Sequence, residues 1–131
     1  MGRGVIMPLS RRELGALGEK IALDFLIERD FTILERNFRC REGEIDIVAR
    51  QRDCLVFVEV RTRASPNMGT PEESITPAKG QRLVTLAQTY LQSHEDLPTQ
   101  WRIDVIAIDM DRQGKPSRVE LVENAISDNS G

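Results

Sequence analysis

Apolar positions along the chain recur at two spacings, which separate predicted helices from predicted strands. From Ser10 to about Arg29 they recur every three or four residues, which is typical of a helix with one buried face. A second helix is predicted to begin at Thr76-Pro77, a capping residue followed by a first-turn proline, and to end near Ser93. The predicted buried stripe of the first helix is Leu14, Leu17, Ile21 and Phe25, flanked by the small residues Gly15, Gly18 and Ala22.

Alternating or continuous apolar runs predict the strands. The run Leu55-Val56-Phe57-Val58 indicates a strand buried on both faces. In the first strand, Phe31, Ile33 and Glu35 are assigned to one face, and Asn37–Glu42 after it is interpreted as a polar turn. The predicted strands are Phe31–Phe38, Glu44–Arg50, Cys54–Arg63, Trp101–Asp109 and a short final Arg118–Ala125.

This order of elements predicts an α/β fold. A helix between the third and fourth strands permits a parallel crossover, so a mixed central sheet of four to five strands flanked by helices is expected. The 131 residues suit one domain over residues 10–126. Residues 1–9 are expected to form a flexible arm and residues 127–131 a disordered tail.

Charge is more informative by its distribution than by its sum. The net charge is −3, which is no global basic footprint, yet only three of the 18 basic residues are lysines. Arginine matches phosphate geometry well, although pairing with Glu35, Glu42 and Asp53 on a solvated surface would explain the same composition. The arginines that crowd the middle of the chain are Arg36, Arg39, Arg41, Arg50, Arg52, Arg61 and Arg63.

Several chemistries are disfavoured by composition. Cys40 and Cys54 form no C-x-x-C pair, and His94 is the single histidine, which argues against a Cys/His zinc site. Nucleophilic triads would need His94, whose polar surroundings suit a solvated helix end. The sequence has neither a membrane-length apolar stretch nor a signal-peptide pattern, so we expect a cytoplasmic protein without a membrane partner.

Two acids and a cation on neighbouring strands carry the main candidate chemistry. Asp46 lies in one predicted strand, and Glu59 and Arg61 share a face of the next. Hard carboxylate oxygens beside a guanidinium suit a divalent cation and a phosphate. Glu19, on the flank of the first helix, could add a third carboxylate. An ordinary ion-pair network is the other interpretation that the spacing leaves open, because buried carboxylates usually have partners.

Five segments together resemble a known family. They are Gly15-Ala16-Leu17-Gly18-Glu19, Asn37-Phe38-Arg39, Gly43-Glu44-Ile45-Asp46-Ile47-Val48, Val56-Phe57-Val58-Glu59-Val60-Arg61-Thr62-Arg63 and Arg102-Ile103-Asp104-Val105-Ile106. Their order and spacing from about Arg11 to Asp109 resemble the YraN family of uncharacterised bacterial proteins. That family resembles the PD-(D/E)XK nucleases, closest to Holliday-junction resolvases, which implies a restriction-endonuclease-like fold.

The resemblance implies roles for particular residues. Glu19, Asp46 and Glu59 correspond to ligands of Mg²⁺ or Mn²⁺, with Asp46, Glu59 and Arg61 as the catalytic set. Arg61 replaces the motif lysine; it can contact phosphate but cannot act as a general base, because arginine stays protonated. The implied substrate is DNA, plausibly branched, and a two-fold junction favours a homodimer. The expected nucleic-acid contacts are Arg39, Arg41, Arg61, Arg63 and Lys79.

Three functions follow from these features. The first is a metal-dependent nuclease acting on DNA. The second is a nucleic-acid-binding module of the same fold without efficient catalysis, which the arginine at position 61 and the acidic net charge favour. The third is a protein-interaction domain whose acids form structural ion pairs with arginines.

Overall fold

The computed structural model describes residues 9–64, 75–111 and 113–126. These residues form an α/β fold, as predicted from the order of the elements. The predicted tail at 127–131 and residues 1–8 of the predicted arm lie outside the described residues. The elements are α1 (Arg11–Glu28), β1 (Thr32–Cys40), β2 (Gly43–Gln51), β3 (Cys54–Arg63), α2 (Pro77–Ser93), β4 (Gln100–Met110) and β5 (Pro116–Ile126).

One five-stranded sheet joins all the strands in sequence order, β1-β2-β3-β4-β5. The pairs β1–β2, β2–β3 and β4–β5 are antiparallel, whereas β3 and β4 are parallel. The parallel pair requires a crossover, which α2 supplies between these strands. The sheet is therefore mixed, as predicted, and the short final strand is confirmed and extended.

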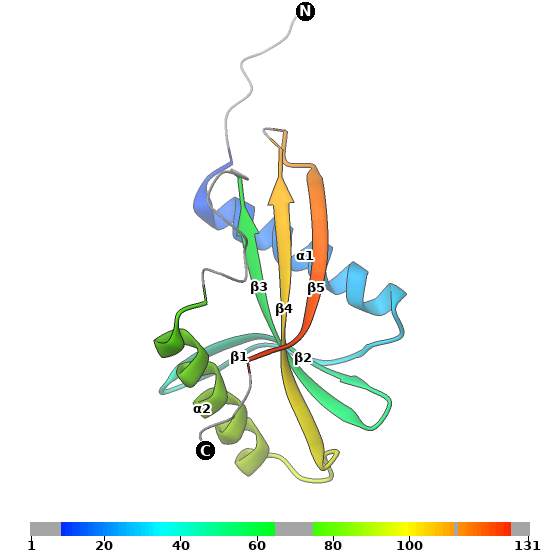
Figure 1. Ribbon diagram of the computed structural model, residues 1–131, viewed down its shortest axis with the longest axis vertical. Coiled ribbons are helices and arrows are strands. Elements are labelled where there is room, and N and C mark those ends of the chain that lie inside the picture. Colours follow the sequence, from blue (N-terminus) through cyan, green and yellow to red (C-terminus); the bar gives the residue numbers. More distant parts are fainter. Residues whose placement is uncertain (1–8, 65–74, 112, 127–131) are drawn as a thin grey trace, which may run out of the picture.

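Two hydrophobic cores hold the helices on opposite faces of the sheet. Ala22 and Leu26 of α1 pack with one set of strand residues, including Val56 and Val58. The α2 residues, among them Tyr90, pack with the alternate set on the other face. Figure 1 shows α1 crossing behind β3, β4 and β5, with α2 on the near side beside their lower half. Because β3 contributes alternate side chains to both cores, its apolar half is buried on both faces, as the sequence indicated.

Helix α1 contacts the sheet through small residues. It begins with a capping box, in which the Ser10 hydroxyl accepts from the Glu13 backbone N–H and the Glu13 carboxylate accepts from the Ser10 N–H. The predicted stripe packs against the core as expected but is only partly buried, and the buried residues of the helix are Gly18, Ala22 and Leu26. Gly18 and Ala22 of the small flank face the sheet, because they permit closer contact than larger side chains would, whereas Gly15 is exposed.

Strand β1 also departs from the prediction. The strand continues to Cys40, so only Arg41 and Glu42 form the turn that was expected over Asn37–Glu42. A register shift between Ile33 and Glu35 breaks the alternation, so these residues do not share a face. Ile33 packs on the α1 side, whereas Glu35 approaches His94 at the end of α2.

No helix in the described parts of the chain is long and apolar enough to cross a membrane.

The close contact of α1 with β3 predicts a contrast between two glycines. A Cβ at Gly18 would overlap the side chain of Thr62, whereas one at Gly15 would meet no atom within 4 Å. We expect Gly18→Ala to destabilise the protein by about 1–3 kcal/mol. Gly15→Ala should be neutral or stabilising by up to about 1 kcal/mol, since alanine favours helix. Urea denaturation would measure both, and equal effects would contradict this packing.

Candidate metal centre

The candidate centre lies where β2 separates from β3. The β2–β3 ladder runs from the Gln51–Cys54 pair to the Ile47–Val58 pair. Beyond it, residues 59–63 of β3 continue their ladder with β4. Asp46 stands at the split, and its Oδ2 accepts a hydrogen bond of 2.8 Å from the backbone N–H of Val60. The carboxylate thus takes the place of a backbone acceptor on the edge of β3 from which β2 has separated.

A reversal of faces in β2 aims Asp46 at this edge. Ile45 packs in the α2-side core and Ile47 in the α1-side core, although residues two apart in a regular strand share a face. The strand therefore twists sharply at Asp46, and the carboxylate is directed towards β3.

The residue opposite this twist has an unusual backbone. Asn37 has a φ of 54°, in the left-handed region that asparagine tolerates better than most residues. The ladder pairs on either side place it opposite Asp46. These pairs are Arg36–Ile47 and Phe38–Ile45. The sequence offered Asn37 only as a polar residue at the predicted turn, and its contribution to the site was missed.

Glu59 and Arg61 extend the centre along β3. The Arg61 Nη1 lies 3.4 Å from the Glu59 Oε2, which confirms that the two side chains share a face. The Glu59 side chain is 17% exposed, so it is shielded but reachable from solvent. Val60, between them, directs its N–H to Asp46. In a β-strand the C=O of a residue points to the same side as its N–H, so the Val60 carbonyl also faces the split.

The acids of the centre act on one another electrostatically. The pKa of Asp46 is raised from 3.8 to about 8, chiefly by burial, and the charge of Glu59, a hydrogen bond with Glu59 and the charge of Glu19 contribute to this shift. The Val60 N–H opposes the shift by favouring the charged form. Near neutral pH, Asp46 therefore retains a proton that a bound cation would replace.

Glu19 approaches from α1 but is held by an arginine. Its Oε1 lies 3.4 Å from the Nη2 of Arg36, and its side chain is 18% exposed. Within the part of the chain that the structure describes, no three acidic, histidine or cysteine side chains converge into a ready-made metal cage. Glu19, the third predicted ligand, thus lies near Asp46 and Glu59 but does not form a three-carboxylate cluster with them.

The donor set fits Mg²⁺ or Mn²⁺. Mg²⁺ keeps several waters and is usually held by one or two carboxylates together with substrate phosphates, so a complete protein cage is not required. Asp46 and Glu59 supply hard oxygens, and the mutual repulsion of their charges would be relieved by a cation. The residues that would hold the ion are Asp46 and Glu59, with Glu19 and the Val60 carbonyl available beside them.

The remaining predicted nucleic-acid residues are spread more widely. Arg39 binds Glu44 across the β1–β2 hairpin, with 2.6 Å between its Nε and Oε2, and Arg41 is exposed at the turn. Lys79 lies in the first turn of α2, where the Thr76 hydroxyl accepts from its backbone N–H. Arg63 is directed into a buried pair with Asp109, with 2.8 Å between its Nε and Oδ1. The structure therefore brings Arg61 alone of these five to the carboxylate pair.

Other polar features of the fold have structural roles. The buried Asp104 accepts from the Arg102 guanidinium at 2.9 Å and from the Asn124 backbone N–H at 2.8 Å, as expected for a structural acid. His94 follows the last turn of α2 and stacks on Tyr90, with 3.8 Å between ring centroids.

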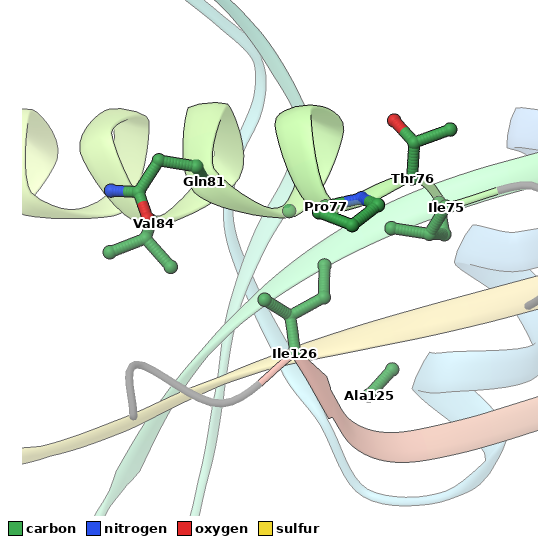
Figure 2. A pocket seen from close by; sticks show the side chains of 8 residues that line it. Ile75, Thr76, Pro77, Gln81, Val84, Ala125 and Ile126 are labelled. Carbon is green, nitrogen blue, oxygen red and sulfur yellow. The ribbon is translucent and has the colours of Figure 1, made fainter. Parts of the chain in front are cut away.

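A cavity of about 300 Å³ opens between the start of α2 and the end of β5. Figure 2 shows Ile126 beneath Pro77 and Val84 in this cavity. Its described lining residues carry no ionisable side chain, which separates it from the candidate chemistry at the β2–β3 split.

The raised pKa of Asp46 predicts a pH-dependent stability in the absence of metal. Between about pH 4 and pH 8 the folded protein binds more protons at this carboxyl than the unfolded chain, so stability should fall as pH rises. Asp46→Asn retains an oxygen for Val60 and removes the titration. We expect it to stabilise the protein at pH 8, with the gain shrinking towards pH 4, at about 1.4 kcal/mol for each pKa unit shifted.

Chemical denaturation in EDTA across this pH range would measure the effect. Asp53→Asn, at an exposed turn, controls for the loss of one negative charge. Parallel pH curves for the wild type and Asp46→Asn would contradict the assigned titration.

The backbone of Asn37 predicts a second contrast. Glycine adopts positive φ readily, so Asn37→Gly should preserve the twist opposite Asp46. Asn37→Val should destabilise the protein by about 1–3 kcal/mol, because a β-branched residue is strained there. Thermal unfolding would compare the two variants, and a valine variant as stable as the glycine variant would rule out this conformation.

Comparisons with known proteins agree with the sequence resemblance. Residues 18–108 match the model of the uncharacterised protein family UPF0102. A UPF0102 protein of Chloroflexus aurantiacus is 55% identical over 104 residues, covering 78% of this chain and 83% of its own length. Another from Moorella thermoacetica is 45% identical over 119 residues, covering 91% and 99%. The chain therefore belongs to UPF0102, the uncharacterised family that the YraN resemblance predicted.

Proposed function

We propose that this protein is a metal-dependent phosphodiesterase acting on DNA, with Asp46 and Glu59 as ligands of Mg²⁺ or Mn²⁺. The observation that carries the proposal is the position of two interacting carboxylates at the split of the sheet, where the β2–β3 ladder ends. A carboxylate with a purely structural role would be paired at such a place with an arginine or lysine side chain. Asp46 instead has Glu59 and Glu19 as the neighbours that raise its pKa.

The chain's own residues would divide the work of hydrolysis. A bound divalent cation would supply positive charge for the phosphate and lower the pKa of a bound water. Asp46 and Glu59 would hold that cation, and Val60 fixes Asp46 through its N–H. Arg61, beside Glu59, would neutralise charge that develops on the phosphate in the transition state. It cannot take a proton from water, because its guanidinium remains protonated.

A nucleic-acid-binding module is the second function that a specific observation favours. Arg61 lies 3.4 Å from Glu59 and offers phosphate binding without proton transfer. Such a module would bind DNA through the same surface and turn it over slowly or not at all. Replacing Arg61 by lysine separates the two functions, since a lysine with a lowered pKa can accept a proton.

Branched DNA is the proposed substrate class, and a homodimer is the proposed assembly. Both rest on the likeness to Holliday-junction resolvases. A junction has two symmetric scissile strands, and a two-fold dimer would present one centre to each of them.

The proposal predicts metal-dependent cleavage of at least one DNA form. The test uses four-way junctions, flaps, duplexes and single strands with Mg²⁺ or Mn²⁺. Asp46→Ala should lower the rate by roughly two orders of magnitude, since it removes a charged ligand at the reacting centre. Asp53→Ala, an acid at the exposed β2–β3 turn, should leave the rate unchanged.

The outcomes separate the proposed functions. Cleavage that survives Asp46→Ala would exclude this centre as the active site. Salt-sensitive binding of junctions without turnover, unchanged in Arg61→Lys, would favour the binding module. A protein-interaction domain would show neither salt-sensitive DNA binding nor a rise in melting temperature with Mn²⁺ that Asp46→Asn abolishes.

A further inference from the structure

We infer that Arg36 is a second phosphate-binding residue, held on Glu19 until a divalent cation recruits that carboxylate. The inference rests on the proposed function, because it assigns a role to a residue at the same centre. The sequence placed Arg36 among many arginines without distinguishing it. The structure distinguishes it through the acid that it contacts.

The contact joins two elements that flank the split. Arg36 lies in β1, directly before Asn37 and paired across the ladder with Ile47, next to Asp46. Its Nη2 lies 3.4 Å from the Oε1 of Glu19 in α1. Glu19 is near enough for its charge to act on Asp46. The Arg36 guanidinium is therefore ion-paired with Glu19, an acid beside the Asp46–Glu59 pair.

The pair is suited to exchange. Arg36 is 55% exposed and makes a single long contact with Glu19, so the interaction is weak and easily given up. A cation held by Asp46 and Glu59 would attract the Glu19 carboxylate more strongly than one exposed guanidinium does. Arg36 would then be released at the rim of a positively charged centre, and a phosphate oxygen is the natural replacement for its lost carboxylate.

The exchange links two binding events. A metal must displace Arg36 from Glu19, whereas a phosphate gains Arg36 once the metal is bound. Metal and nucleic acid should therefore bind cooperatively, and by reciprocity each should raise the affinity of the other.

Arg39 provides a matched control for this idea. It lies three residues further along β1 and also pairs with a glutamate, Glu44, with 2.6 Å between the Nε and Oε2 atoms. It is exposed, as Arg36 is, but its glutamate is not among the acids that act on Asp46. Removing either arginine deletes one positive charge from the same hairpin, and only Arg36 should alter the metal site.

The experiment measures two affinities for each variant. Titration calorimetry gives Mn²⁺ affinity for the wild type, Arg36→Gln and Arg39→Gln. We expect Arg36→Gln to bind Mn²⁺ about two- to fivefold more tightly, because a weak competing pair is removed. Its affinity for a four-way junction in Ca²⁺ should fall about three- to tenfold, and the salt dependence of binding should lose about one phosphate contact. Arg36→Lys should retain most of the junction affinity, and Arg39→Gln should leave Mn²⁺ affinity unchanged.

The opposite signs make the inference falsifiable. Loss of a merely structural arginine would weaken or preserve Mn²⁺ binding, or would leave the junction affinity in Ca²⁺ unchanged. Either result in a folded Arg36→Gln protein, verified by its melting temperature, would overturn the inference while wild-type Mn²⁺ binding still supported the proposed function. Absence of Mn²⁺ binding by the wild type would overturn both.

Discussion

The hydrogen bond from the Val60 N–H to Asp46 is the constraint on which the centre depends. Strand β3 must continue beside β4 after β2 has turned away, and a backbone N–H on its free edge needs an acceptor. A carboxylate from the departing strand supplies it at 2.8 Å. The same bond therefore completes the sheet at the split and fixes an acid there. The Oδ2 atom of Asp46 thus serves both the stability of the sheet and the candidate chemistry. Its hydrogen bond explains why this carboxyl can remain in a poorly solvated place.

The buried acids of this fold differ in how their charge is balanced. Asp104 and Asp109 are almost completely buried, and each is neutralised by an arginine. Such pairs offset the cost of desolvation, and removing one partner would leave an uncompensated charge. Burial raises the pKa of Asp46, and the charges of its acidic neighbours Glu59 and Glu19 add to the shift. The fold thus pairs the acids of β4 directly with arginines. At the split, arginines pair with Glu19 and Glu59, while the charges of these two acids act on Asp46, and an added cation would relieve that repulsion.

Local patterns in the sequence predicted the elements and part of the centre, but not its long-range contacts. Strand Cys54–Arg63 was predicted with its observed bounds, because a continuous apolar run followed by alternating charges leaves few alternatives. The stripe predicted for α1 packs against the core but is only partly buried, since periodicity cannot tell whether large or small residues lie closest to a sheet. The Arg36–Glu19 pair joins residues on different elements, and the φ of Asn37 reflects a twist shared by two strands. Neither depends on spacing along one segment.

The charges of the centre explain how two arginines could coexist with the proposed metal site. With Asp46 protonated, the charges of Glu19 and Glu59 are balanced by Arg36 and Arg61, so these five described side chains together are neutral. Replacing the Asp46 proton with a divalent cation leaves the pocket with one net positive charge. A neutral pocket has little attraction for DNA, whereas a positive one attracts it. The arginines thus balance the charges of the acids without metal. Under the proposed function they would contact phosphate once a metal is bound, and the arginine at position 61 is consistent with a centre that would bind phosphate only in its metal-bound form.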